Sequence, residues 1–201
     1  MTRTRLANLL FSLLFADDQG LDGTLPPEIG HLSKLESFIL KNNPDLNGFL
    51  PSELGHMRKL RQLGLYNNDL SGVIPSDVFE HAHSLKYINL EGNKLWGSIP
   101  LTIQSLASLE TLVLSHNKLE GVVPFDQLVS TNVKYLGLGH NRFSSVIERS
   151  VKNVQTLEYL YLDHNEMRGR IPDSLGFLTN LGTYQQSPSS MVPSVFSPAL
   201  S

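Results

Sequence analysis

The chain has 201 residues, of which 40% are hydrophobic and 8% aromatic, so it has enough apolar surface for a continuous hydrophobic core. Its formal net charge is -3, with 16 Lys and Arg against 19 Asp and Glu and no basic patch, which argues against nucleic acid as a partner. The absence of cysteine excludes disulfides, Cys-bearing zinc sites and thiol nucleophiles.

The first segment of the chain allows two interpretations. Arg3 and Arg5 precede an apolar run at residues 6–16, a pattern typical of a secretory signal peptide. The same run also fits the first unit of a repeat that starts at Leu10, in which case residues 1–9 are the remnant of a cap. No apolar run in the chain reaches the roughly 20 residues that a membrane-spanning helix requires.

A repeat with a period of 24 or 25 residues runs through most of the chain. Its seven units start near residues 10, 35, 60, 85, 109, 133 and 157, and an incomplete eighth starts at Leu181. A period of this length is typical of a solenoid, in which each unit buries a face against the next. We therefore expect one repeat domain at residues 10–181, followed by a disordered Ser/Pro-rich tail at 182–201.

Each unit contains a leucine-x-leucine step, whose period of two predicts a strand with the leucines inward and the flanking residues outward. The stacked strands should form a parallel sheet on the concave side of the solenoid. In the first unit this alignment places Leu13 and Phe15 inward and Leu14 outward, with Asp18 at the ninth position. After the strand, a glycine turn and an extended X-Pro pair lead to apolar residues spaced for short 3₁₀ or helical turns on the convex side.

The ninth position of the other units holds an asparagine. A buried amide there can donate to and accept from backbone groups of adjacent turns, so its predicted role is structural. This asparagine ladder consists of Asn43, Asn68, Asn93, Asn117, Asn141 and Asn165. The unit that starts at Val133 lacks the glycine and the proline at residues 144–148, where we expect local irregularity.

The complete motif is clearest at residues 109–124, LETLVLSHNKLEGVVP, which reads L-x-x-L-x-L-x-x-N-x-L-x-G-x-φ-P, with φ an aliphatic residue. This motif resembles the plant-type leucine-rich repeats of receptor-like proteins, receptor-kinase ectodomains and polygalacturonase inhibitors. The resemblance implies an α/β right-handed horseshoe solenoid that needs no cofactor. It also implies a monomeric module, receptor-like or inhibitor-like, that binds a protein, peptide or glycan outside the cell through the concave face.

The resemblance leaves the compartment and the extent of the protein open. Members of that family usually carry cysteine pairs at both ends of the repeats, and this chain has no cysteine. It is therefore a fragment or a divergent stand-alone module, at the cell surface or in the cytoplasm. An intracellular protein-interaction scaffold is one alternative function, and a structural binder of wall polymer or ice is another.

Tyrosines gather at the outward strand positions and form the candidate ligand-binding site. Tyrosine combines apolar area with a polar tip and is favoured at binding surfaces. The hypothetical recognition patch consists of Tyr66, Tyr87, Tyr135, Tyr159, Tyr161 and Asp163. Gly137 and Gly139 should leave a shallow space beside these rings. The competing interpretation is that tyrosines occur there because they favour strands.

Histidines form a second column, because His116, His140 and His164 each precede a ladder asparagine. Imidazoles one strand spacing apart could respond to pH through mutual repulsion, but such histidines are also simply solvated, and no metal site is predicted. The motifs of metalloproteases, phosphate-binding loops and serine hydrolases are absent. We therefore predict no catalytic residues and no enzyme activity.

Overall fold

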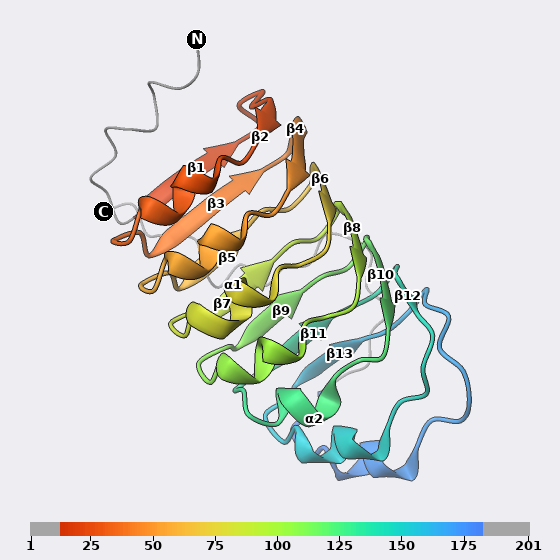
Figure 1. Cartoon of the computed structure of the whole chain (residues 1–201). Coiled ribbons are helices and arrows are strands. Elements are labelled where there is room, and N and C mark those ends of the chain that lie inside the picture. Colours follow the sequence, from red (N-terminus) through yellow and green to blue (C-terminus); the bar gives the residue numbers. More distant parts are fainter. Residues whose placement is uncertain (1–12, 183–201) are drawn as a thin grey trace.

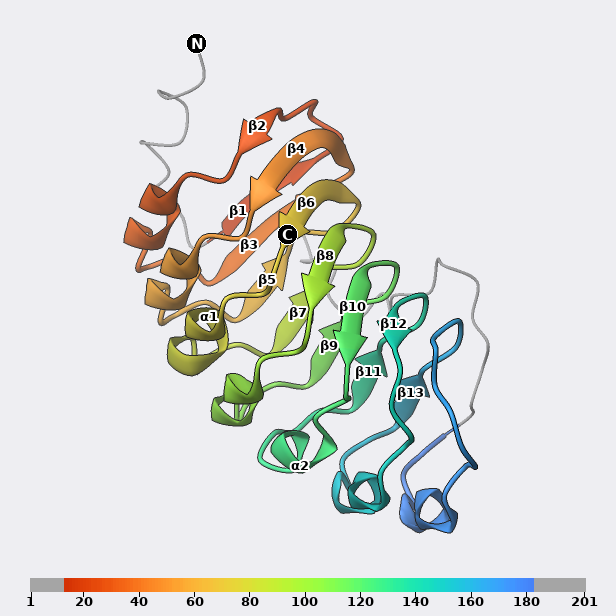
Figure 2. The ribbon, with the colours of Figure 1, turned by 45° about the vertical axis from the view of Figure 1, so that its right-hand side comes forward.

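The computed structural model describes residues 13–182, which coil into a right-handed solenoid of stacked units (Figure 1). Two parallel sheets and a row of short helices form three sides of the coil, as Figure 2 shows from a second direction. The predicted N-terminal segment and most of the predicted tail lie outside the described residues. Among the described residues, no helix is long and apolar enough to cross a membrane.

The longer sheet contains one strand from each unit, in the order of the chain. Neighbouring strands pair in parallel with partners 24 or 25 residues apart, such as Leu63 and Ile88, which the repeat period requires. Its strands are β1 (Leu13–Asp17), β3 (Ser37–Lys41), β5 (Gln62–Gly64), β7 (Tyr87–Asn89), β9 (Thr111–Val113), β11 (Tyr135–Gly137) and β13 (Tyr159–Tyr161).

The extended pieces after the asparagine ladder form a second parallel sheet, which the sequence did not predict as a sheet. Its strands are β2 (Gly23–Thr24), β4 (Asn43–Phe49), β6 (Asn68–Gly72), β8 (Lys94–Gly97), β10 (Lys118–Gly121) and β12 (Arg142–Phe143). Strand β12 ends where the segment 144–148 begins, in agreement with the irregularity predicted there. A glycine is required in this sheet at Gly72, where φ is +85° and a Cβ would lie 2.6 Å from the Phe49 ring.

The return path of each unit is a single short helical turn, as predicted. Five turns are 3₁₀ helices and two are α-helices. They are η1 (Pro27–His31), η2 (Ser52–His56), α1 (Ser76–His81), η3 (Leu101–Ser105), α2 (Phe125–Leu128), η4 (Arg149–Asn153) and η5 (Asp173–Phe177). Each turn packs apolar side chains against the inward leucines of the sheets, so that one continuous core runs the length of the solenoid.

The ladder asparagines join successive turns. Asn93 is buried, its Nδ2 donates to the carbonyls of Leu65, Leu90 and Glu91, and its Oδ1 accepts from the Leu70 N–H. Asn141 makes an equivalent set one unit after Asn117. The ladder therefore satisfies backbone groups that the turns would leave unpaired in the core.

The predicted register of the first unit is wrong by one residue. Leu13 pairs with Ser37 and Leu14 with Phe38, so Leu14 points into the core, while Leu13 and Phe15 are exposed. Asp18 consequently does not hold the ladder position. Instead, Gln19 stands there, and its backbone N–H donates to Asn43 Oδ1 at 3.1 Å. Leucine and phenylalanine occur at adjacent positions in this stretch, so hydrophobicity alone could not distinguish the two registers.

Candidate functional site

The outer face of the longer sheet carries the residues of the predicted recognition patch. Side chains alternate along each strand, so that Leu136 and Leu160 point into the core and their neighbours point outward. Tyr87, Tyr135, Tyr159 and Tyr161 lie in strands of this sheet, whereas Tyr66 and Asp163 stand just beyond β5 and β13. All six residues thus belong to the same face, but the structure divides them into separate groups.

Three tyrosines form one group at the C-terminal end of the face. The ring centroid of Tyr135 lies 5.8 Å from that of Tyr159 and 5.2 Å from that of Tyr161. Register explains the contact with Tyr159, which is the pairing partner of Tyr135 in the adjacent strand. Burial and the neighbouring Tyr161 raise the pKa of Tyr135, so its hydroxyl stays protonated and able to donate a hydrogen bond at physiological pH.

The shallow space predicted beside Gly137 and Gly139 is filled. A Cβ on Gly137 would lie 3.2 Å from the ring of Tyr135, and a Cβ on Gly139 would lie 2.7 Å from Oδ1 of Asp163. The two glycines therefore accommodate the neighbouring ring and carboxylate rather than a hollow for a ligand.

Tyr66 belongs to a different group, at the N-terminal end of the face. The ammonium of Lys41 lies 5.7 Å from the ring centroids of both Tyr66 and Phe15, and 2.9 Å from Oδ2 of Asp17. The hydrogen bonds from Lys41 and Asn42 lower the pKa of Asp17, and the bond to Asp17 raises the pKa of Lys41. The N-terminal end of the face therefore carries the ion pair of Lys41 and Asp17, with the ammonium near the rings of Phe15 and Tyr66.

Tyr87 lies between the two ends. Burial raises the pKa of Tyr87 to about 12, although the hydrogen bond from Asn89 acts in the opposite direction. Asn89 Nδ2 donates to the Tyr87 hydroxyl at 3.2 Å. The Tyr87 side chain is therefore held by a residue of its own strand.

The residue before each ladder position adopts a left-handed backbone conformation, with φ between 49° and 65°. Asn, Asp, Gly and His tolerate this region better than most residues. The column reads Asp18, Asn42, Asn67, Gly92, His116, His140 and His164. It therefore changes from short amides in the N-terminal units to imidazoles in the C-terminal units.

The three imidazoles of this column form a continuous stack. The His116 and His140 centroids are 4.1 Å apart with 14° between the planes, and the His140 and His164 centroids are 4.0 Å apart with 9° between the planes. Burial lowers the pKa of His116, and the neighbouring His140 and His164 lower it further. The pH response of the stack stays a prediction.

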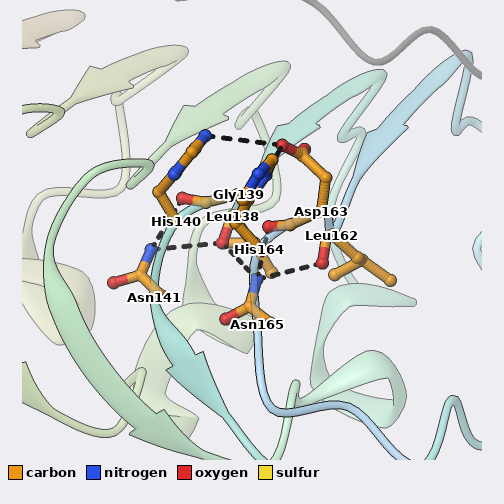
Figure 3. Close-up of polar contacts among 8 residues, drawn as sticks. All are labelled: Leu138, Gly139, His140, Asn141, Leu162, Asp163, His164 and Asn165. Atoms are coloured by element: carbon orange, nitrogen blue, oxygen red, sulfur yellow. Dashed lines mark hydrogen bonds and ion pairs between the residues drawn. The ribbon is translucent and has the colours of Figure 1, made fainter.

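The carboxylate of Asp163 lies against the last two rings of the stack, as Figure 3 shows. Its Oδ2 is 3.6 Å from Nε2 of His140 and 3.0 Å from Nδ1 of His164. The sequence hypothesis placed Asp163 among the tyrosines and missed this contact. The sequence did contain a signal for this contact. Asp163 and His164 occupy the same repeat positions as Gly139 and His140 in the preceding unit, so the aspartate stands beside a glycine and near both histidines.

Leucine-rich repeat models match two parts of the chain. One, described as "Leucine rich repeat", matches residues 72–119, and another, described as "Leucine Rich Repeat", matches residues 59–80 and 156–178. A search of curated protein sequences gave no match.

Several solved structures are similar to this solenoid. The receptor kinase HAESA from Arabidopsis, solved with the peptide hormone IDA and the co-receptor SERK1, is 32% identical with a TM-score of 0.77. The match covers 84% of this chain and 28% of that chain. The PEPR1–AtPEP1 structure is 29% identical with a TM-score of 0.74, over 80% of this chain and 22% of that chain.

A shorter relative is covered more completely. Pollen Receptor Kinase 3 is 31% identical with a TM-score of 0.69, and the match covers 80% of this chain and 77% of that chain. By contrast, the chain spans less than a third of the length of HAESA and PEPR1.

Proposed function

Because the chain belongs to the plant-type leucine-rich repeat proteins, we propose that it is a non-catalytic, receptor-like recognition module that binds a protein or peptide ligand. The contact of Tyr135 with Tyr159 and Tyr161 carries this proposal, since it gathers three aromatic rings at one end of the outer sheet face. HAESA was solved with a peptide hormone and a co-receptor, which supports a peptide or protein ligand rather than a glycan.

The tyrosine group has the properties of a binding surface. Tyrosine presents a large apolar area together with a hydroxyl, and it loses little conformational entropy when it is immobilised. Tyr159 remains 40% exposed at the edge of the sheet, because no further strand of the described chain covers β13. A ligand that packs on these rings would bury aromatic area that already stands in a fixed arrangement.

The proposal can be tested with a displayed library of random peptides as the probe. Peptides selected on the wild-type chain should bind the triple variant Tyr135→Ala, Tyr159→Ala, Tyr161→Ala at least about tenfold more weakly, because clustered aromatic residues dominate binding energy. Titration of each synthetic peptide by fluorescence anisotropy gives the affinities.

The matched control removes exposed apolar side chains from the opposite side of the solenoid. Leu101 and Phe177 are 61% and 64% exposed on η3 and η5, so Leu101→Ala, Phe177→Ala should leave the affinities unchanged. If most selected peptides bound the tyrosine variant as tightly as the wild type, the outer face of the C-terminal units would not be the recognition surface.

A further inference from the structure

We propose that His140, Asp163 and His164 form a binding site for a divalent transition metal ion of the zinc class. Among residues 13–182, this is the one group of three residues whose ligand atoms all lie within 4.8 Å of one another. The inference goes beyond ligand recognition by the tyrosines and does not depend on it.

The chemistry of the donor set selects the class of ion. Two imidazole nitrogens and one carboxylate oxygen suit zinc and its neighbours, whereas magnesium and calcium prefer sites built from oxygen alone. The set supplies three protein ligands, so a tetrahedral ion would keep one position for water or for a group of a bound partner.

The distances are close to those that coordination requires. Bonds of about 2.0–2.1 Å in a tetrahedron place neighbouring donor atoms about 3.3 Å apart. The Asp163 Oδ2 lies 3.6 Å from His140 Nε2 and 3.0 Å from His164 Nδ1, which brackets this value. The two rings are stacked, so a shared ion requires them to rotate toward each other, and side-chain exposures of 39% and 64% leave both rings room to do so.

The carboxylate is held in place by the repeat itself. Asp163 has a side-chain exposure of only 14%, and it occupies the space that a Cβ on Gly139 would fill. The backbone N–H of His140 donates to the backbone carbonyl of Asp163 at 2.9 Å, and Asn165 Nδ2 donates to the same carbonyl at 3.2 Å. The backbone of both turns is thus fixed before any ion binds, which lowers the entropic cost of assembling the site.

The third imidazole of the stack packs against His140 from the preceding unit. The His116 ring lies 4.1 Å from that of His140 and covers the face that His164 does not contact. By contrast, the histidines on the helical side are separate: His81 Nδ1 is 3.2 Å from the Asp77 carbonyl, and His83 Nδ1 is 3.3 Å from the Ser105 carbonyl.

Isothermal titration of the untagged full chain with zinc chloride tests the site, with magnesium chloride as the comparison ion. We expect saturable binding of one zinc ion per chain and no heat of binding with magnesium. Asp163→Asn and His164→Asn should each weaken zinc binding at least about tenfold, as the loss of groups in a metal site does. Asparagine is the suitable replacement for His164, because Asn42 and Asn67 adopt the same left-handed conformation in earlier units.

His31→Gln serves as the control, since His31 is exposed at the end of η1 and should not alter zinc affinity. A second measurement needs no variant: zinc should shift the imidazole NMR resonances of His140 and His164 in the wild-type chain and leave those of His31 in place. Absence of saturable zinc binding, equal affinity in the Asp163→Asn chain, or shifts confined to other histidines would each overturn the proposal.

Discussion

The two ends of the outer sheet face use the same backbone positions for different chemistry. At the N-terminal end, Asp17 pairs with Lys41 and accepts a hydrogen bond from Asn42, whose Oδ1 in turn accepts from Asn67. At the C-terminal end, Asp163 stands at the same repeat position as Asp17, and its neighbour in the preceding unit is Gly139. One carboxylate is neutralised by a lysine, and the other faces two imidazoles.

The column of left-handed residues divides in the same way. At one end the side-chain amides of Asn67 and Asn42 are hydrogen-bonded in series to Asp17. At the other end the stacked imidazoles contact Asp163, and Gly92 stands between the two groups in the column. The asparagine ladder stands one residue further along the chain and continues through both halves. The ladder therefore holds the solenoid together in every unit, while the side chains at the two positions before it differ from one end to the other.

The largest effect should come from the ladder. Asn93→Ala removes the partner of the Leu70 N–H and of the Leu65 carbonyl in the core, while the Leu90 and Glu91 carbonyls keep bonds from Asn117 Nδ2 and the Asn67 N–H. We therefore expect the free energy of unfolding in urea to fall by about 3 kcal/mol. Asn67→Gly is the matched control one position before the ladder, because the next unit holds a glycine, Gly92, in the same column. It loses an exposed hydrogen bond to Asn42, so the free energy of unfolding should fall by less than about 1 kcal/mol. Equal losses would mean that the two columns do not differ in structural role.

Gly139→Ala should have the next largest effect. The added methyl would lie 2.7 Å from Oδ1 of Asp163 and displace the carboxylate, at a cost of about 1–2 kcal/mol in unfolding free energy. Zinc affinity should fall in the same variant. Gly176→Ala is the control, because a Cβ there meets nothing within 4 Å. A stable Gly139→Ala chain with unchanged zinc affinity would contradict the distinction between the two ends.

The ion pair at the N-terminal end should contribute less. Lys41→Met removes the 2.9 Å contact with the partly exposed Asp17, and exposed pairs contribute below about 1 kcal/mol. Because the pKa of Asp17 is lowered in the folded chain, this contribution is present at neutral pH and is lost as the pH falls through the lowered pKa. Urea unfolding of both chains across acidic pH measures it; a difference that persisted at the lowest pH would show that the lysine acts through packing instead.

The smallest effect should come from Glu91, a third carboxylate in the same column as Asp17 and Asp163. Burial raises the pKa of Glu91, so the folded wild-type chain binds this proton more tightly than the unfolded chain and loses stability as the pH rises through the raised pKa. Glu91→Gln should therefore be slightly more stable than the wild type at pH 7, with no gain at about pH 3.5, where the carboxylate is protonated. A gain that did not depend on pH would contradict this.

Most of the fold follows from the sequence because it depends on the period. Leucines spaced by two and an asparagine at a fixed offset repeat unit after unit, so strands, ladder and helical turns could be predicted with their residues. The register of β1 could not, since Leu13, Leu14 and Phe15 are all apolar and either register buries leucine. The pairing of the second sheet was also missed, because its strands show no hydrophobic alternation of their own.

The candidate site was less predictable because contacts between outward side chains depend on side-chain directions, not on the period. Sequence spacing correctly put Tyr135, Tyr159 and Tyr161 on one face, and it put the histidines in one column. It did not show that the Tyr135 ring lies over Gly137, or that Asp163 leans over Gly139 toward His140. It also grouped Tyr66 with the other tyrosines, although Tyr66 contacts Lys41 at the opposite end.

The most direct test of the recognition proposal compares the two ends in one binding experiment. Peptides selected on the wild-type chain are titrated against Tyr135→Ala, Tyr161→Ala at one end and Phe15→Ala, Tyr66→Ala at the other. We predict at least about a tenfold loss of affinity for the first variant and less than about a twofold change for the second. A loss confined to the Phe15→Ala, Tyr66→Ala variant would contradict the claim that the C-terminal end of the outer face recognises the ligand.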